Sequence, residues 1–496
     1  MNQDNGGIIG KINTPTTSVA SGVWTLDSQF ESQSSSIWPL AFPQTTFTNS
    51  CRLNKSDSPY LNRTNGTATN NDKYTLSLWT KRGLVSSAFE FLIEGWTANG
   101  DTTCGILRFR SDDRLDFMGY NTVYRRTTRV FRDISAWYNI IVAVDTTQST
   151  ASDRIKMYIN GVEETEFDTN NNPSQNANTG INNNSANLNL FRRYLGSVND
   201  LHFGGYCTEY CFIDGQQLDQ TSFGEFDEDS GIWKPIDVTG LTFGTNGFYL
   251  DFEDSSALGN DVSGNNNDFT VNNLTSIDQN EDTCTNNWCT QNPLSYRSGQ
   301  TVPTYSEGNL KVVYAAGVNT FSYGTLGVQA GKWYWEVKVT FGSNVYTGIG
   351  FDSAATNTDI NGYLLRQTGQ IYNTSGSASS YASALSTGDT VMVAFDADNG
   401  TLWFGVNGTW SNSATQTEIE NGTTTNSAFS GIDMSSIWLP LSKGGTSSNS
   451  NTQSNFGNEI YSISSGNSDA NGHGNFEYTV PSGYFALCTK NLAEHG

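Results

Sequence analysis

Acidic residues are the first candidates for chemistry, because glycosidases built on jelly rolls place paired carboxylates on one strand face, commonly as Glu-x-Asp-x-Glu. Glu225 and Asp227 match the first two positions of such a motif, but Asp229 stands where the last glutamate belongs. The segment also follows a turn and does not alternate as a strand would. The sequence therefore predicts a solvated acidic loop here, and no catalytic residue.

Nucleophiles and metal ligands are sparse. The three histidines are His202, His473 and His495, and they lack the spacing of a zinc site or a catalytic triad. His202 lies in an apolar strand lead-in and is predicted to be structural. Of the seven cysteines, Cys284 and Cys289 flank a loop and could pair, whereas the others are expected to be reduced.

We predict no cofactor, with calcium as the one open question. Calcium sites in proteins are built from carboxylate and backbone carbonyl oxygens. Asp145, Asp153 and the 261–268 loop are candidates, although EF-hand-like spacing is absent. Ordinary surface acids are the competing interpretation.

Four arginines stand close together in this acidic chain: Arg125, Arg126, Arg129 and Arg132. If they lie on a strand, Arg126 and Arg132 share one face and the other two share the opposite face. We interpret them as candidates for an interface between subunits, with intramolecular pairing as the alternative. Trp24 and Trp38 are further interface candidates, because they are isolated anchors in an apolar-poor segment.

Candidates for ligand binding are aromatic residues in expected rim loops of the second half. Aromatic rings stack on the apolar faces of sugars, while neighbouring Asn and Ser bond the hydroxyls. The alternative is that each ring is a core or loop anchor. The candidate residues are Tyr363, Tyr372, Tyr381 and Trp410.

The elements that must position these side chains are predicted to be strands. Residues 333–340 alternate apolar and polar side chains, and 140–144 form a continuous apolar run. Strand patterns at 155–159 and 402–406 each end in Asn-Gly, the dipeptide favoured in two-residue hairpin turns. Helical periodicity is nearly absent, so the predicted fold class is all-β, with two jelly-roll β-sandwiches in tandem behind an N-terminal extended segment.

Composition excludes several function classes. The chain has 496 residues, a net charge of −23 and only 15% charged residues, and no apolar run could span a bilayer. The charge argues against nucleic-acid binding, which requires cations to neutralise phosphates. Residues 1–250 hold 19 Lys and Arg against 27 Asp and Glu, whereas residues 251–496 hold 7 against 22. The second half therefore presents mainly hydroxyls and amides.

Composition also sets the predicted boundaries. Residues 1–44 form an extended attachment segment, 45–277 the first sandwich, 278–308 a linker and 309–496 the second sandwich. Polar insertions at 373–380, 411–428 and 444–454 interrupt the second sandwich. Long polar loops on a β scaffold are where binding usually occurs.

The second half resembles a SPRY domain. The ordered blocks that carry the resemblance are 331–337 (GKWYWEV), 347–351 (TGIGF), 388–396 (GDTVMVAFD), 399–408 (NGTLWFGVNG), 438–441 (WLPL) and 455–457 (NFG). The resemblance implies a bent two-sheet sandwich that binds partners through rim loops and has no catalytic activity. It does not identify a ligand.

The first half resembles a laminin-G-like, concanavalin-type jelly roll at 74–83 (YTLSLWTKRG), 136–145 (AWYNIIVAVD) and 154–161 (RIKMYING). Other blocks are similar to virion and tail-fibre proteins of marine and cyanobacterial tailed phages: 212–219, 222–229, 244–252, 261–268 and 285–289.

These resemblances imply a non-enzymatic virion protein of the tail or its fibres that contributes to attachment to a host-surface glycan. Expected partners are other virion proteins and further copies of the chain, as in the trimers of many phage fibres. Neither nucleic acid nor membrane insertion is expected. Two alternatives are a capsid-decoration or head-fibre subunit on the head surface, and a host-envelope polysaccharide depolymerase.

Overall fold

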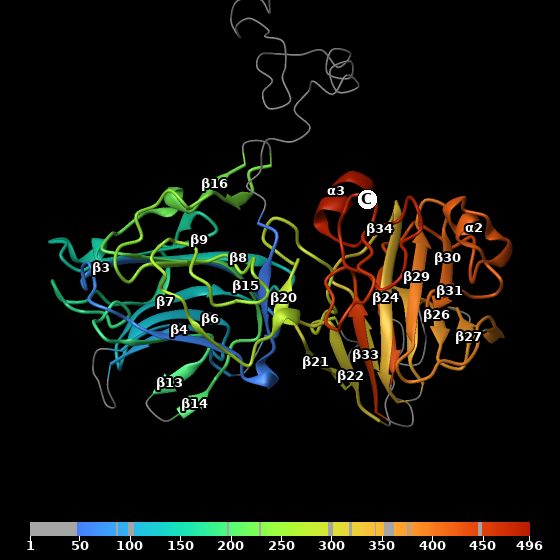
Figure 1. The fold of residues 1–496 in the computed structure, drawn as a ribbon, viewed down its shortest axis with the longest axis horizontal. Coiled ribbons are helices and arrows are strands. Elements are labelled where there is room, and N and C mark those ends of the chain that lie inside the picture. Colours follow the sequence, from blue (N-terminus) through green and yellow to red (C-terminus); the bar gives the residue numbers. More distant parts are fainter. Residues whose placement is uncertain are drawn as a thin grey trace, which may run out of the picture. The chain divides into compact units, whose positions relative to one another are not determined.

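The strands predicted from hydrophobic alternation form two β-sandwiches in the computed structural model (Figure 1). The structure describes residues 47–496 except 86–87, 98–103, 196–197, 228–229, 296–300, 317–319, 343, 352–361, 374–375, 377 and 445–448. The predicted attachment segment, with Trp24 and Trp38, lies outside the described residues. Residues 47–496 cluster as one compact unit.

One sheet of the first sandwich has the order β10-β9-β8-β3-β15-β1-β20, and β18 also pairs with β15. The central run 140–144 is fully buried, as its continuous apolar sequence predicts. The strands of this sheet are β1 Ser50–Leu53, β3 Lys73–Arg82, β8 Trp137–Asp145, β9 Ile155–Ile159, β10 Val162–Glu163, β15 Gly205–Asp214, β18 Phe248–Leu250 and β20 Gln279–Asn280.

The facing sheet has the order β11-β7-β6-β5-β4-β12-β2-β19. Its apolar side chains join those of the first sheet in one core, which includes Leu76, Val142, Phe117 and Leu188. The strands are β2 Tyr60–Thr64, β4 Glu90–Trp96, β5 Gly105–Phe109, β6 Arg114–Gly119, β7 Val123–Val130, β11 Phe167–Asn170, β12 Asn187–Leu190 and β19 Thr270–Asn272. Two separate hairpins pair β13 Arg193–Leu195 with β14 Val198–Asp200, and β16 Gly224–Phe226 with β17 Trp233–Pro235.

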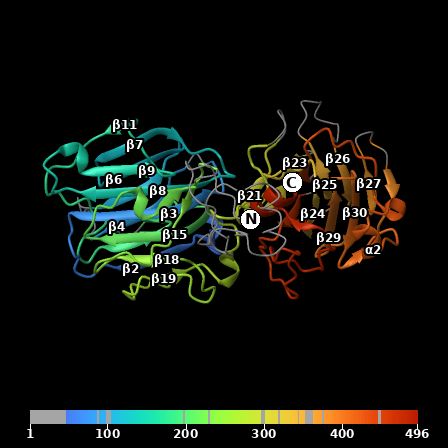
Figure 2. The ribbon, with the colours of Figure 1, turned by 90° about the horizontal axis from the view of Figure 1, so that it is seen from above.

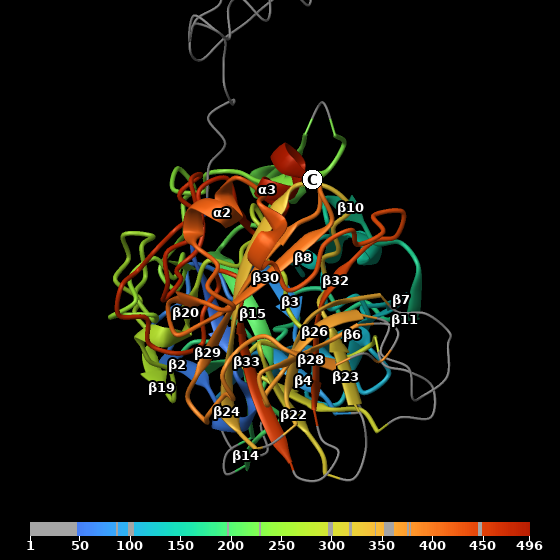
Figure 3. The ribbon, with the colours of Figure 1, turned by 90° about the vertical axis from the view of Figure 1, so that its right-hand side faces the viewer.

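The second sandwich begins with a sheet of order β21-β22-β33-β24-β29-β30-β31, to which β34 adds in parallel beside β24. Figure 3 shows β33, β24, β29 and β30 in this sheet. Its strands are β21 Thr304–Ser306, β22 Lys311–Tyr314, β24 Lys332–Phe341, β29 Thr390–Asp396, β30 Thr401–Val406, β31 Thr409–Trp410, β33 Ser450–Asn455 and β34 Phe485–Ala486.

The opposing sheet has the order β23-β32-β25-β26-β27-β28, visible in part in Figure 2. Trp333, Trp335, Val393 and Phe404 contribute to the core of this sandwich. The strands are β23 Thr320–Tyr323, β25 Tyr346–Gly350, β26 Gly362–Arg366, β27 Gln370–Tyr372, β28 Ala378–Ser380 and β32 Leu439–Gly444.

Helices are short wherever the chain is described. The α-helices are α2 Gln416–Glu420 and α3 Thr489–His495, and the 3-10 helices are η1 Lys55–Asp57, η2 Ala151–Asp153, η3 Gln220–Ser222, η4 Ser276–Asp278 and η5 Thr424–Asn426. None of the described helices is long and apolar enough to cross a membrane. The architecture is all-β, as predicted.

Both predicted Asn-Gly hairpins are present. Asn160 and Gly161 have φ of 49° and 76°, and Asn407 and Gly408 have φ of 48° and 81°. Two successive left-handed residues define the type I′ turn that matches the twist of the strands. The dipeptides therefore fixed the registers of β9–β10 and β30–β31.

The connecting segment 278–308 packs against both sandwiches. Lys81 of β3 places its Nζ 2.7 Å from Asp282 Oδ2, and both side chains are buried. Trp137 Nε1 donates to the other oxygen of Asp282 at 3.0 Å. Trp288 is fully buried in a core cluster with Tyr334 and Trp403 of the second sandwich. The segment that connects the sandwiches is therefore also part of their packing.

All seven cysteines are free thiols in the structure, including Cys284 and Cys289, whose pairing the sequence left open. Burial raises the pKa of Cys289 to about 11, so this thiol stays protonated and weakly nucleophilic. Cys207 and Cys211 both lie on β15. Between them Glu209 adopts φ 53° where the register with β3 shifts, which marks a β-bulge.

Candidate functional site

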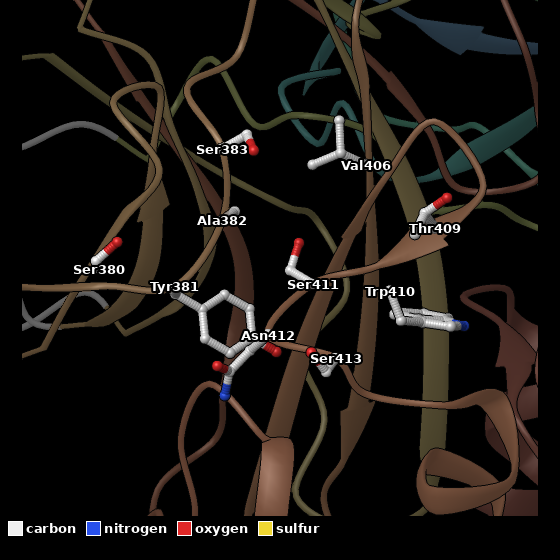
Figure 4. Close-up of a pocket in the computed structure, with 10 residues that line it drawn as sticks. All are labelled: Ser380, Tyr381, Ala382, Ser383, Val406, Thr409, Trp410, Ser411, Asn412 and Ser413. Atoms are coloured by element: carbon white, nitrogen blue, oxygen red, sulfur yellow. The ribbon is translucent and has the colours of Figure 1, made fainter.

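A cavity of about 540 Å³ opens in the second sandwich beside the end of the β30–β31 hairpin (Figure 4). One wall is the segment that follows β28, and the other is β31 with the loop after it. The lining residues are Ser380, Tyr381, Ala382, Ser383, Val406, Thr409, Trp410, Ser411, Asn412 and Ser413. Two of the four predicted ligand-binding aromatics, Tyr381 and Trp410, therefore meet at one cavity.

Both rings are largely built into the protein. Tyr381 is 7% exposed and Trp410 is 8% exposed. The Tyr381 hydroxyl donates to the Asn426 carbonyl at 3.2 Å, and its ring meets Phe404 edge-on with centroids 6.3 Å apart. Burial raises the pKa of Tyr381, so its hydroxyl stays protonated. These rings anchor the walls of the cavity and offer a ligand only a narrow apolar surface.

Short polar side chains form the rest of the lining. In the view of Figure 4, Ser411 and Ser413 lie between the rings of Tyr381 and Trp410, and the Asn412 amide lies beside Tyr381. The described lining includes no Asp, Glu, Lys, Arg or His. Such a lining can exchange hydrogen bonds with a neutral, hydroxyl-rich ligand, and it holds no acid–base pair for hydrolysis.

The backbone of this loop is held in an unfavourable conformation. Asn412 has φ 56° and Ser413 has φ 62°, so two successive non-glycine residues are left-handed. Asparagine tolerates this region, but serine adopts it at a cost. Ser411 N donates to Phe404 O at 3.0 Å and Ala414 N donates to Ser411 O at 3.0 Å, which hold the loop at both ends. The structure thus maintains a fixed arrangement of polar groups.

The other two predicted aromatics lie elsewhere. Tyr363 on β26 packs edge-on against Phe429 with centroids 4.9 Å apart, and against Trp438 at 5.3 Å. The Tyr372 hydroxyl on β27 accepts a hydrogen bond from Arg366 at 3.0 Å. Neither residue lines the cavity, and both have the packing contacts of a loop or core anchor.

Sequence reasoning did not single out the serines that line the cavity. Serine is common in this chain, and no spacing distinguishes Ser380, Ser383 and Ser411 from the others. Only the position of the polar insertions indicated this cavity, because the insertions at 373–380 and 411–428 each supply part of its wall.

The arginine group is paired within the chain. Arg125 is buried and donates to the carbonyls of Tyr124, Asn171 and Ile155. The Nε atoms of the other three reach carboxylates: Arg126 to Asp116 at 2.7 Å, Arg129 to Glu164 at 2.9 Å and Arg132 to Asp113 at 2.9 Å. The prediction that Arg126 and Arg132 share one strand face is not met, because β7 ends at Val130 and Arg132 lies beyond it. The side chains of Arg129 and Arg132 are 49% and 62% exposed, so both remain accessible.

The calcium candidates are occupied by protein hydrogen bonds. Asp145 accepts from Thr147 and Gln148 and pairs with Lys73 at 3.1 Å. Asp261 accepts backbone N–H groups from Tyr249, Ser263 and Asn267. Asp153 pairs with Lys156 at 3.4 Å. Within the described ranges no group of three or more His, Cys, Asp or Glu side chains could hold a metal ion.

The remaining chemical candidates do not form a catalytic arrangement in the described structure. Glu225 lies on β16, a short strand that the sequence did not predict, and both Glu225 and Asp227 pair with Lys234 at 3.3 and 3.2 Å. His202 is buried, as predicted, with Nδ1 3.1 Å from the Pro59 carbonyl. Burial lowers the pKa of His202, which favours the neutral ring.

Two family models match parts of the chain. The model described as the concanavalin A-like lectin/glucanases superfamily matches residues 55–206, and the SPRY domain model matches residues 332–425. Together with the sheets described above, these matches establish a concanavalin-like β-sandwich followed by a SPRY β-sandwich. The expected laminin-G-like and SPRY domains are confirmed. None of the curated proteins compared with the chain matches it.

Several solved structures are similar at low identity. The SPRY domain of human HERC1 is 16% identical, covers 33% of this chain and 96% of its own, and gives a TM-score of 0.27. Another human SPRY domain is 10% identical, with coverages of 34% and 100% and a TM-score of 0.23. A heptameric SAP-like pentraxin from Limulus polyphemus is 12% identical, with coverages of 35% and 79% and a TM-score of 0.26.

Proposed function

We propose that this chain is a non-enzymatic virion protein of a tailed phage, in the tail or its fibres, and that it binds a host-surface glycan in the cavity at Tyr381 and Trp410. The single observation that carries the binding role is the cavity itself. Its described lining offers hydroxyls, one amide and the edges of two rings, and it has no charged side chain. These groups suit a neutral sugar.

The virion role rests on the sequence blocks that resemble phage proteins, and the binding role does not depend on it. Two further features support a non-catalytic role. The cavity lacks an acid–base pair among its described lining residues, and Glu225 and Asp227 of the broken carboxylate motif both form ion pairs with Lys234.

The first experiment measures binding of the full chain to an array of bacterial lipopolysaccharides and capsular polysaccharides. Glycan binding should weaken about tenfold in Asn412→Gly, which removes the amide and keeps a residue suited to φ 56°. Ser435→Ala, at an exposed serine that is not part of the cavity lining, is the matched control and should bind normally. Binding that is equal in both variants would contradict the assignment of the cavity.

The same glycans distinguish the alternatives. A subunit that contacts only virion proteins would bind none of them, and a depolymerase would release reducing sugar from those it binds. We expect binding without release. Locating the chain in a reconstruction of the virion tests the proposed tail position against the head surface.

A further inference from the structure

A second cavity, of about 330 Å³, has a different chemical character from the first. Its lining comes from the entry to β1, the connecting segment, the loop at 472–473 and the start of α3. The residues are Phe47, Thr48, Asn49, Glu281, Thr283, Asn286, Gly472, His473 and Lys490. It therefore brings together a carboxyl group, an imidazole, an ammonium group and two side-chain amides, whereas the first cavity has no charged side chain.

The walls of this second cavity are held by hydrogen bonds. Lys490 N donates to Asn286 Oδ1 at 3.1 Å, and Thr285 Oγ1 donates to Phe47 O at 2.9 Å. Gly474 N donates to Glu281 Oε2 at 3.3 Å, and this bond joins the loop that contains residues 472–474 to the connecting segment. The side chains of Asn286 and Glu281 are thus held in place before any ligand enters, which reduces the entropic cost of binding.

Most described cations of this part of the chain contact an acid or an aromatic ring. Residues 251–496 contain seven Lys and Arg, and the described ion pairs in the second sandwich join Lys332 to Asp396 and His495 to Glu494. Lys338, Arg366 and Lys443 lie over aromatic rings. Lys490, like Lys311, takes part in none of these contacts, but Lys490 lines the cavity, where it is half-buried.

The surroundings of Glu281, the acid in the cavity, favour its neutral form. Burial, followed by the nearby charges of Glu459 and Asp469, raises the pKa of Glu281 to about 7. Burial lowers the pKa of His473. The positive charge of Lys490 also lowers it, whereas the negative charges of Asp469 and Glu494 raise it. Below pH 7 the Glu281 carboxyl is therefore mostly protonated and supplies an O–H donor, beside the Lys490 and His473 side chains of the lining. This set favours an anion that accepts hydrogen bonds.

We infer that this second cavity binds the carboxylate of a hydroxylated acid, either a free sugar acid or a uronic acid residue of a polysaccharide. Lys490 pairs with the carboxylate, the Glu281 carboxyl donates to it, and Asn49, Asn286 and Thr48 bond the hydroxyls. This site is separate from the neutral-sugar cavity, and its occupation does not depend on the function proposed above.

Calorimetric titration of the full chain with glucuronate tests the inference, with glucose as the neutral comparison. Glucuronate should bind at pH 6 and glucose should not. Affinity should fall about tenfold at pH 8, because a group with a pKa near 7 is then about one-tenth protonated. Equal binding of the two sugars, or binding of neither, would overturn the inference.

Two variants assign the binding to named groups. Lys490→Met should weaken glucuronate binding at least tenfold, whereas Lys311→Met, at a half-buried lysine on β22, should not change it. Glu281→Gln keeps a donor that does not ionise, so its affinity at pH 8 should match that at pH 6. An unchanged affinity in Lys490→Met would overturn the site, and circular dichroism of each variant at both pH values checks that it is folded.

Further probes identify the source of the carboxylate. Tighter binding of a trimeric oligouronate than of glucuronate indicates a polysaccharide, and equal binding indicates a free acid. Tighter binding of inorganic phosphate than of either would overturn the choice of a carboxylate. Asn412→Gly should leave glucuronate binding unchanged, so failure of the first cavity and failure of this one are distinguishable.

Discussion

The two sandwiches have similar architecture, but buried acids at two of their sites are stabilised in different ways. In the first, arginines surround buried carboxylates: Arg82 contacts Glu90 and Asp113 at 2.9 Å, and Asp116 is reached by Arg108, Arg110 and Arg126. In the second, buried Glu336 accepts hydrogen bonds from Tyr334 Oη at 2.9 Å and from the backbone N–H groups of Glu477 and Tyr478 at 3.1 and 2.8 Å.

This contrast follows from the uneven supply of cations along the chain. Ion pairing keeps a buried carboxylate charged, whereas burial without a cation favours its neutral form. Burial accordingly raises the pKa of Glu336 to about 7. The Arg82 site of the first sandwich is therefore sensitive to removal of a cation, and the Glu336 site of the second is sensitive to pH. The following predictions test this difference, from the largest expected effect to the smallest.

Arg82→Met should destabilise the protein by about 3–5 kcal/mol, because it removes the buried cation shared by Glu90 and Asp113. The more exposed Lys55 and Arg132 are then their remaining ion-pair partners. The Arg82 side chain is fully buried and also donates to the Phe131 carbonyl at 2.7 Å. Urea denaturation followed by tryptophan fluorescence measures the loss. A loss below about 1 kcal/mol would mean that charge compensation is not what stabilises this sandwich.

Glu336 should make the free energy of unfolding fall as pH rises. Its folded pKa of about 7 exceeds the ordinary 4.5, so its contribution is fully present below pH 4.5 and is lost as pH rises through 7. The difference in pKa corresponds to about 3 kcal/mol. Urea denaturation at several pH values from 4.5 to 8 measures it. Glu336→Gln cannot ionise and should lose this part of the slope, whatever its absolute stability; an unchanged slope would contradict the prediction.

Ser413→Gly should stabilise the protein by about 0.5–1 kcal/mol, because glycine removes the cost of a side chain at φ 62°. Thermal unfolding measures the gain. Ser411→Gly is the matched control within the same loop, and no gain is expected because Ser411 does not adopt the left-handed region. Equal shifts in both variants would show that the backbone conformation of the cavity loop carries no strain.

Arg129→Met should cost less than about 1 kcal/mol, although the residue has an ion-pair partner at 2.9 Å. Its side chain is 49% exposed, so water screens the pair with Glu164. Comparison with Arg82→Met by urea denaturation separates buried from surface pairing in one sandwich. If subunit assembly also changes in this variant, as analytical ultracentrifugation would detect, the interface interpretation of this arginine gains support.

Local patterns predicted much of the fold. Alternation at 333–340 predicted β24, and Asn-Gly at 160–161 and 407–408 predicted the two type I′ hairpins. These features depend on neighbours in sequence, so they can be recognised without the tertiary structure. The β-bulge at Glu209 escaped prediction, because it arises where β15 must pair with both β3 and β18.

The sites were predicted less well. Tyr381 and Trp410 were singled out by residue type, but the same reasoning selected Tyr363 and Tyr372, which pack elsewhere. The second cavity was not foreseen at all. Glu281, His473 and Lys490 are separated by long stretches of chain, and nothing in their spacing indicates that they line one cavity.

By itself the sequence determined the all-β class, the two hairpin turns and the shortage of cations in the second half, since each depends on residue type and local order. Tertiary structure decided which acids are paired with arginine, which are buried without a cation, and which loops meet at a cavity. Those outcomes depend on contacts between distant residues, and burial there changes pKa values that composition alone leaves at their ordinary level.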